Sequence, residues 1–190
     1  MRGGALVKLL GTLVVVASTV ALALALALVL GLTLLAPSAR SASLSIYRVA
    51  RVIDGDTIEL GNGQHVRLVQ IDTPEVYFEP ECFGHQASAA TERLLPYGTL
   101  VRLAVEPVTD RVDQYGRLLR YVIRARDGVD VNIRLVAIGA AAPYFYDGRR
   151  GRYADRLESL ARRARSKHLG LWVACPRTPY DPYHGVQTRR

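Results

Sequence analysis

The chain has 190 residues, of which 49% are hydrophobic and 22% charged, with a formal net charge of +8. This length allows one domain of ordinary size plus extra segments at its ends, and it leaves no room for several large domains. All 17 acidic residues and all but two of the 25 basic residues follow Pro37, and Lys167 is the one Lys among the latter. Such an Arg-rich, basic part suits a polyanionic partner, although a preference for Arg codons explains the composition equally well.

The N-terminal segment is strongly apolar. Arg2 and Lys8 precede Leu9–Ala36, a run of 28 residues without any charge. The run is longer than the roughly 7–15 residues of a cleaved signal peptide core, and longer than the ~20 needed to cross a membrane as a helix. We therefore expect residues 1–37 to be a signal-anchor transmembrane helix, or a signal peptide if the small residues around Pro37 are a cleavage site. The domain is then expected outside the cell membrane, anchored or secreted.

After a Ser- and Ala-rich linker at 38–45, alternating apolar and polar residues predict a series of strands. The predicted strands are 46–53, 57–60, 65–71, 100–105 and 118–123. Helical spacing and terminators predict three helices, at 84–95, 131–138 and 152–168. Three hairpin-linked strands, a helix and two more strands is the order of a five-stranded OB-type Greek-key barrel, an α+β and mainly β fold. We expect this domain to span 46–175 and the tail at 176–190 to be disordered, with Tyr180 and Tyr183 solvated.

Three clusters of polar residues carry the chemical information. Asp54-Gly55-Asp56-Thr57 joins the first two predicted strands, and Arg67 to Glu75 closes the third with Asp72-Thr73-Pro74. Asp113-Gln114-Tyr115-Gly116-Arg117 precedes the fifth strand. Each cluster alone is ordinary, since Asp-Gly-Asp is usually a simple turn and Tyr-Gly-Arg suits a hairpin corner.

Taken together, in this order and at these separations, the clusters resemble the staphylococcal nuclease (thermonuclease) family. The resemblance runs from about Tyr47 to Trp172 and includes Gly84 at the first helix, Val131-Asn132 at the second and Gly170-Leu171-Trp172 after the third. The fold of that family is the OB barrel with three helices, which agrees with the order of elements. The resemblance implies a hydrolase, an endonuclease-like enzyme that cleaves phosphodiester bonds in DNA, RNA or both.

The resemblance also implies roles for individual residues. The calcium ligands would be the carboxylates of Asp56 and Asp72 and the backbone carbonyl of Thr73. The catalytic groups would be the phosphate-binding Arg67 and Arg117 and the water-activating carboxylate Glu75. Asp54 is similar to an acid that supports the metal ligands, and the nucleotide contacts would be Tyr115, Tyr144 and Tyr146. The loop at 76–83 is shorter and more apolar than the lysine-rich loop of the family, which leaves substrate docking open.

Phosphodiester hydrolysis explains why these residue types are needed. Attack by water builds a second negative charge on the phosphate oxygens. A hard cation such as Ca²⁺, held by oxygen ligands, neutralises this charge and positions the water, and two Arg forks hold the same oxygens. Two carboxylates and one carbonyl leave much of the calcium shell to water and substrate. The site should therefore bind calcium weakly without substrate, which is tolerable outside cells, where calcium is millimolar.

Cysteine and histidine give less information. Cys82 and Cys175 could pair in an oxidising compartment, but their spacing says nothing about the distance between them. The four His residues are scattered, with no His or Cys at the spacing of zinc ligands.

Two other readings compete with the nuclease. One is a catalytically silent OB barrel that binds nucleic acid at the membrane, and the other is an envelope-anchored structural protein. A decayed enzyme would typically lose one of the implied carboxylates or arginines, and all are present. The sequence therefore favours a nuclease, which we expect to act as a monomer.

Overall fold

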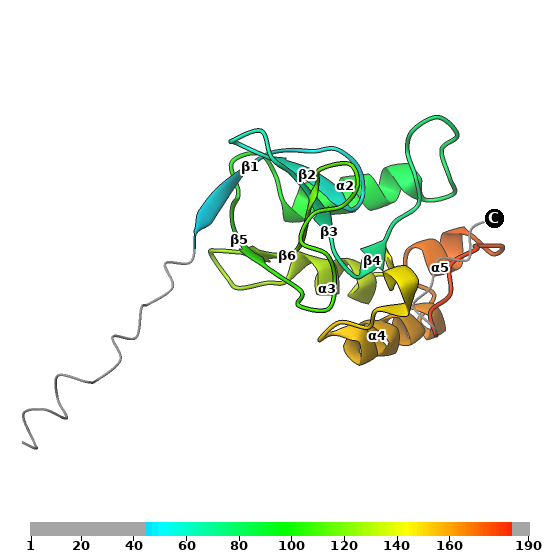
Figure 1. Cartoon of the computed structure of the whole chain (residues 1–190). Helices are drawn as coiled ribbons and strands as arrows, with labels where there is room; N and C mark the ends of the chain where they lie inside the picture. The colour runs from blue at the N-terminus through cyan, green and yellow to red at the C-terminus, as the bar shows by residue number, and fades with distance from the viewer. Residues whose placement is uncertain (1–44, 184–190) are drawn as a thin grey trace, which may run out of the picture. The chain divides into compact units, whose positions relative to one another are not determined.

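A closed five-stranded barrel forms the centre of the computed structural model, which describes residues 45–183 (Figure 1). The barrel strands are β1 (Ile46–Val52), β2 (Thr57–Leu60), β3 (His65–Leu68), β5 (Leu100–Ala104) and β6 (Leu118–Arg124). They are hydrogen-bonded in the order β1-β2-β3-β6-β5, and every neighbouring pair is antiparallel except β3 and β6, which run parallel. The predicted five-stranded barrel is confirmed.

Seven shorter or helical elements surround the barrel. In chain order they are β4 (Ile71–Asp72), α2 (Gly84–Leu94), α3 (Val131–Ala137), β7 (Ala142–Pro143), the 3₁₀ helix η1 (Tyr146–Gly148), α4 (Ala154–Ser166) and α5 (Leu171–Ala174). The described residues thus contain a fourth α-helix, where we expected three in all. Gly170 explains the difference: its backbone, with φ 56° and ψ −129°, is not helical, and α5 begins as a new turn immediately after it.

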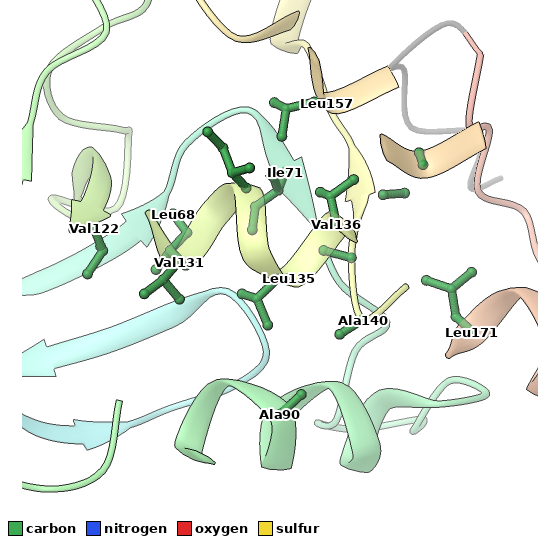
Figure 2. Packing of buried hydrophobic residues seen from close by; sticks show 14 of the residues in the cluster. Leu68, Ile71, Ala90, Val122, Val131, Leu135, Val136, Ala140, Leu157 and Leu171 are labelled. Atoms are coloured by element: carbon green, nitrogen blue, oxygen red, sulfur yellow. The ribbon is translucent and has the colours of Figure 1, made fainter. Parts of the chain in front are cut away.

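The core lies between the barrel and the helices. Figure 2 shows α3 at its centre, with Val131 facing the barrel and Leu135 and Val136 pointing into the surrounding cluster. Leu157 of α4 and Leu171 of α5 belong to the same cluster. Full burial of each such side chain contributes about 1.5–3 kcal/mol, so α3 connects the barrel to the C-terminal helices.

The third predicted strand is wrong in its second half. Instead of one strand over 65–71, the chain leaves β3 after Leu68 and forms the separate β4, which pairs with β7. Gln70 causes the break, because its φ of 65° lies in the left-handed region that a strand does not tolerate. Its buried side chain compensates by donating to the carbonyl of Arg149 (2.8 Å) and accepting from the N–H of Gly151 (2.7 Å). This break turns the chain toward the acidic residues that follow it.

Asn132, fully buried in α3, forms hydrogen bonds to the junction of β3 and β4 and to β6. Its amide nitrogen donates to the carbonyls of Val69 (2.9 Å) and Arg120 (3.2 Å), and its Oδ1 accepts from the N–H of Val122 (3.0 Å). One side chain therefore fixes β6 and the β3–β4 junction to α3. Buried amides satisfied in this way specify a single arrangement, since any alternative leaves them unpaired.

The segment that follows α5 contacts the domain at two places. Cys82, before α2, and Cys175, after α5, form a disulfide that encloses most of the domain. By loop-closure entropy, a bridge over this many residues contributes on the order of 4–5 kcal/mol. Beyond it, Tyr180 is buried, and its hydroxyl bonds to Glu81 (3.2 Å), while Tyr183 is exposed. The prediction of a solvated Tyr180 is therefore wrong. The disordered tail at 176–190 stays a prediction.

The predicted membrane segment at 1–37 lies outside the described residues, as do most of the linker and the last seven residues. Within 45–183 there is no helix of the length and apolarity that a membrane crossing requires.

Candidate active site

Arg67 lies at the centre of the candidate site because of the alternation of β3. Val66 and Leu68 are fully buried in the barrel core, so the side chain between them points to the opposite face of the strand. There Nη1 of Arg67 donates to the carbonyls of Leu68 and Ile71, each at 2.8 Å. The largely buried guanidinium thus closes the turn between β3 and β4.

Two carboxylates meet the same guanidinium. Nη2 of Arg67 donates to Oδ1 of Asp72 at 2.8 Å, and Nε lies 3.1 Å from Oδ1 of Asp56. Asp72 belongs to β4, and Asp56 to the turn between β1 and β2. Both residues are buried, and residues that are distant in sequence are brought together by one cation.

Asp56 is fixed by a second set of contacts. Its Oδ2 accepts from the backbone N–H (3.0 Å) and the hydroxyl (3.1 Å) of Thr73. Gly55 makes this approach possible, because a Cβ there would stand 2.4 Å from the Thr73 hydroxyl oxygen. The hydroxyl of Thr91 in α2 donates to the Gly55 carbonyl and anchors the turn to the helix. The Asp-Gly-Asp sequence is therefore more than a hairpin turn.

Acidic groups outnumber the buried cation. Burial raises the pKa of Asp54 to about 6, and the nearby negative charge of Asp56 adds to this effect. Burial lowers the pKa of Arg67, but the charges of its acidic neighbours outweigh burial and raise this pKa above its ordinary value. Those neighbours are Asp56, Asp72, Asp54 and Glu75. The site is therefore a strongly acidic concentration around one guanidinium.

Arg117 reaches the site from the turn before β6. Its Nη1 donates to the hydroxyl of Thr57 (3.4 Å), the neighbour of Asp56, and its Nε donates to Oδ2 of Asp113 (2.7 Å). Burial raises the pKa of Asp113, but hydrogen bonds from the backbone and side chain of Arg117 outweigh it, and the net pKa is lower than usual. The guanidinium also lies 5.3 Å from the ring centre of the exposed Tyr115. Asp113 thus orients Arg117 toward the acidic residues.

Glu75 and two tyrosines lie around these groups. Glu75 is exposed just beyond β4, close enough for its charge to act on Arg67. Tyr144 follows β7, the partner of β4, and is half-buried. Its pKa is raised by burial and by the charge of Asp72. Tyr146 in η1 is exposed. Contacts and charge interactions thus connect Glu75, Tyr144 and Tyr146 to the groups around Arg67, as they connect Tyr115 to Arg117.

Sequence reasoning gave no role to several residues that shape the site. Asp113 carries a recognisable signal, because an Asp two residues before Tyr115 and three before Gly116 favours a turn in which its side chain caps backbone N–H groups. Thr57 and Tyr77 carry no such signal. Thr57 connects Asp56 to Arg117, and the hydroxyl of Tyr77 donates to the Ile53 carbonyl (2.6 Å), holding the loop after Glu75 to the turn of Asp54.

The donor set fits a hard cation. Asp56 and Asp72 offer carboxylate oxygens around a shared guanidinium, and carboxylate and carbonyl oxygens are the ligands that Ca²⁺ prefers. Within residues 45–183 there is no group of three or more His, Cys, Asp or Glu side chains that could hold a metal ion. A cation held by two carboxylates would need backbone oxygen, water or substrate to complete its shell, since Ca²⁺ takes about six to eight ligands.

Replacing Arg67 tests whether it organises the site. Arg67→Ala should lower the free energy of unfolding by about 3–5 kcal/mol, because it leaves buried acids without their cation. Arg67→Lys keeps the charge but cannot contact two carbonyls and two carboxylates at once, and should recover only part of the loss. Chemical denaturation of both variants measures this, with exposed Arg126→Ala as the control. Equal stability of Arg67→Ala and the control would contradict the role.

Comparison with known proteins shows which family this chain resembles. The family model described as "Staphylococcal nuclease homologue" matches residues 65–174. Thermonuclease of Staphylococcus intermedius is 35% identical over 133 residues, which cover 66% of this chain and 75% of the relative. Thermonuclease of Staphylococcus hyicus is 32% identical over 139 residues, 70% of this chain and 78% of the relative.

A further relative is much longer than the shared region. The SPbeta prophage-derived endonuclease YokF of Bacillus subtilis is 35% identical over 128 residues, 64% of this chain but only 42% of YokF. The chain therefore spans less than half of that relative, whereas it spans most of the two thermonucleases. The family match covers more than half of the chain, and this chain belongs to the staphylococcal nuclease family.

Proposed function

We propose that this protein is a calcium-dependent nuclease, a monomeric hydrolase that cleaves phosphodiester bonds of DNA, RNA or both. Family membership supports the reaction class, since relatives bear the names thermonuclease and endonuclease. The observation that carries the proposal is the convergence of Asp56 and Asp72 on Arg67, with Glu75 and Arg117 beside them. Phosphodiester hydrolysis uses oxygen ligands, guanidinium forks and a proton acceptor together.

The charge balance supports a bound cation. A phosphodiester is itself negative, and at this site it would approach four acidic side chains compensated by one buried guanidinium. A Ca²⁺ ion held by the carboxylates of Asp56 and Asp72 and the carbonyl of Thr73 would supply the missing positive charge and polarise the phosphate. Asp54, whose Oδ1 accepts from the backbone N–H of Asp56 (3.0 Å), supports one of these ligands.

The remaining groups divide the work of hydrolysis. Glu75 is exposed and can accept a proton from a water molecule that attacks phosphorus. Arg117 can donate its second Nη to a phosphate oxygen while Asp113 keeps the guanidinium oriented. Arg67 can donate the second hydrogen of its Nη2 to the same phosphate. These contacts strengthen as negative charge grows on the phosphate oxygens, which is what accelerates the reaction.

The tyrosines suit contacts to the rest of the nucleotide. Tyr144 has a raised pKa, so its phenol stays protonated and can donate a hydrogen bond beside Asp72. Tyr115, beside Arg117, and Tyr146, which interacts with Tyr144, are exposed, and exposed rings provide stacking surfaces for bases. This arrangement offers contacts to sugar and base without reading a defined sequence.

Glu75→Gln separates cleavage from binding. The variant should bind nucleic acid at least as well as wild type, because it loses a negative charge near phosphate, while its turnover falls by about 10²–10⁴-fold. Single-turnover cleavage of plasmid DNA and RNA beside equilibrium binding measures both quantities. If wild type binds both polymers with saturating calcium and cuts neither, the protein is a binding module and the proposed function is wrong.

Calcium dependence is tested at Asp72. Asp72→Asn keeps the shape of the side chain but removes a charged ligand, so cleavage should be lost or should need far more calcium. The measurement is the rate against calcium concentration for wild type and variant, with chelator as the zero point. Asp127→Asn, in the exposed turn after β6, is the control and should behave as wild type. Undiminished cleavage in chelator would remove calcium from the mechanism.

We propose further that the domain acts outside the cytoplasmic membrane, attached through residues 1–37. The long uncharged run supports the attachment, and the Cys82–Cys175 disulfide supports an oxidising compartment. Fractionation of the native protein should find it in the membrane fraction, with its domain accessible to added protease and its two cysteines paired by mass spectrometry. Full release into the medium would rule out the anchor and leave export intact. Free thiols in exported protein would contradict the disulfide.

A further inference from the structure

The backbone of Glu75 is held at both of its polar atoms by a single residue. Its N–H donates to Oε2 of Glu81 at 3.0 Å, and its carbonyl accepts from the N–H of Glu81 at 2.9 Å. Glu81 therefore holds the end of the loop at 76–80 against Glu75, the residue before the loop begins. Both contacts are to main-chain atoms, so they fix the position of the Glu75 Cα while its side chain remains exposed.

The start of α2 restrains the same peptide group. A Cβ on Gly84 would stand 2.1 Å from the carbonyl oxygen of Glu75, so the two backbones approach as only glycine permits. Phe83, immediately before, has φ 72°, a costly conformation for a bulky residue that persists only where surrounding contacts impose it. Residues 81–84 thus restrain the backbone of Glu75, and we call this segment the Glu75 support.

The C-terminal segment reaches this support by two separate connections. The hydroxyl of Tyr180 donates to Oε2 of Glu81, the same oxygen that accepts from Glu75. One residue away, Cys82 is bonded to Cys175. Pro176 and Pro179 stiffen the four residues between the two attachments, Cys175 and Tyr180. The segment from Cys175 to Tyr180 is therefore attached both to the residue that holds Glu75 and to its neighbour.

We infer that Glu81 is a positioning residue for Glu75, and that Tyr180 and the disulfide orient Glu81 for this purpose. The inference rests on the proposed function, since it concerns how the proton acceptor of that reaction is placed. A carboxylate that projects from an exposed loop would otherwise sample many positions, and a shift of about 1 Å can cost on the order of 10²-fold in rate. The arrangement replaces a flexible loop end by one fixed from three directions.

The alternative is that Glu81 only docks the C-terminal segment. In that case its loss would lower stability, without a specific effect on the step that uses Glu75. The two cases differ in one respect that can be measured, namely whether the effect of removing Glu81 depends on the presence of the Glu75 carboxylate. A double-mutant cycle measures this dependence directly.

The experiment uses the full chain, a short single-stranded DNA and a matching RNA, with saturating calcium. Single-turnover rates, dissociation constants and thermal unfolding midpoints are measured for wild type, Glu81→Ala and Glu81→Gln, each with Glu75 and with Glu75→Gln. Glu79→Ala is the control, because Glu79 lies in the same loop and makes no hydrogen bond or ion pair within the described residues. Tyr180→Phe removes only the hydroxyl that orients Glu81.

Glu81→Ala should lower the rate about 10-fold to 10²-fold, with an unchanged or slightly tighter dissociation constant. Glu81→Gln keeps an acceptor oxygen and should recover most of the rate, Tyr180→Phe should lose several-fold, and Glu79→Ala should match wild type. With Glu75→Gln present, removal of Glu81 should have little further effect. Should Glu81→Ala not fold, Tyr180→Phe, measured with Glu75 and with Glu75→Gln, provides the cycle, and its loss should likewise disappear with Glu75→Gln.

Two results would overturn the inference while leaving the nuclease intact. One is a Glu81→Ala rate equal to that of Glu79→Ala, and the other is an equal loss in both Glu75 backgrounds, which would show a purely structural role. An inactive wild type is a different result, because it overturns the proposed function itself and the inference with it.

Discussion

The buried guanidinium of Arg67 is the interaction on which the rest of the site depends. A buried cation is tolerated only when it is paired and hydrogen-bonded, and Arg67 meets this requirement with two carbonyls and two carboxylates. In doing so it restrains the turn that Gln70 makes after β3, and it brings Asp56 and Asp72 to the same cation. Without this cation, these buried acids would repel one another and the turn would lose its main restraint.

The same arrangement leaves the site with more negative than positive charge. Several acids share one buried cation, and the other arginine of the site, Arg117, is already paired with Asp113. Such unbalanced groups cost stability, and proteins retain them mainly where function requires them. Here the deficit is positive charge, which the proposed calcium ion would supply. A barrel that only bound nucleic acid would have no need of a concentrated acidic site facing the phosphates.

The sequence was most informative about the barrel. Strand alternation located all five strands, because one face of each is buried and the signal repeats every second residue. It failed where tertiary contacts override local preference. Gln70 carries no mark of a left-handed residue, and its conformation is maintained by contacts with Arg149 and Gly151, which lie far away in sequence. The pairing of β4 with β7 was missed for the same reason.

The residues of the candidate site were likewise predictable only in part from the sequence. Asp56, Asp72 and Arg67 were identified because their spacing matches a family, and the structure adds how they contact each other. The contributions of Thr57 and Glu81 could not be inferred, since each acts through a hydrogen bond to a neighbour that no pattern reveals. Tyr180 was misread because a Pro- and Tyr-rich tail is usually solvated, and the bond at Cys175 that places it against the domain depends on a distance absent from the sequence.

The Cys82–Cys175 bond also determines what a single proteolytic cut does to the molecule. Exposed loops such as 107–117 and 126–128 are preferred sites of cleavage, and both lie inside the covalent ring. Fragments produced there remain tethered, so their effective concentration stays high and β6 can return to β3 without a second molecular encounter. The loop at 76–80 lies outside the ring, and a cut there leaves β1–β4 held by noncovalent contacts alone. The disulfide thus keeps together the fragments of a cut inside the ring, whereas a cut at 76–80, next to Glu75, leaves no covalent bond between the two fragments.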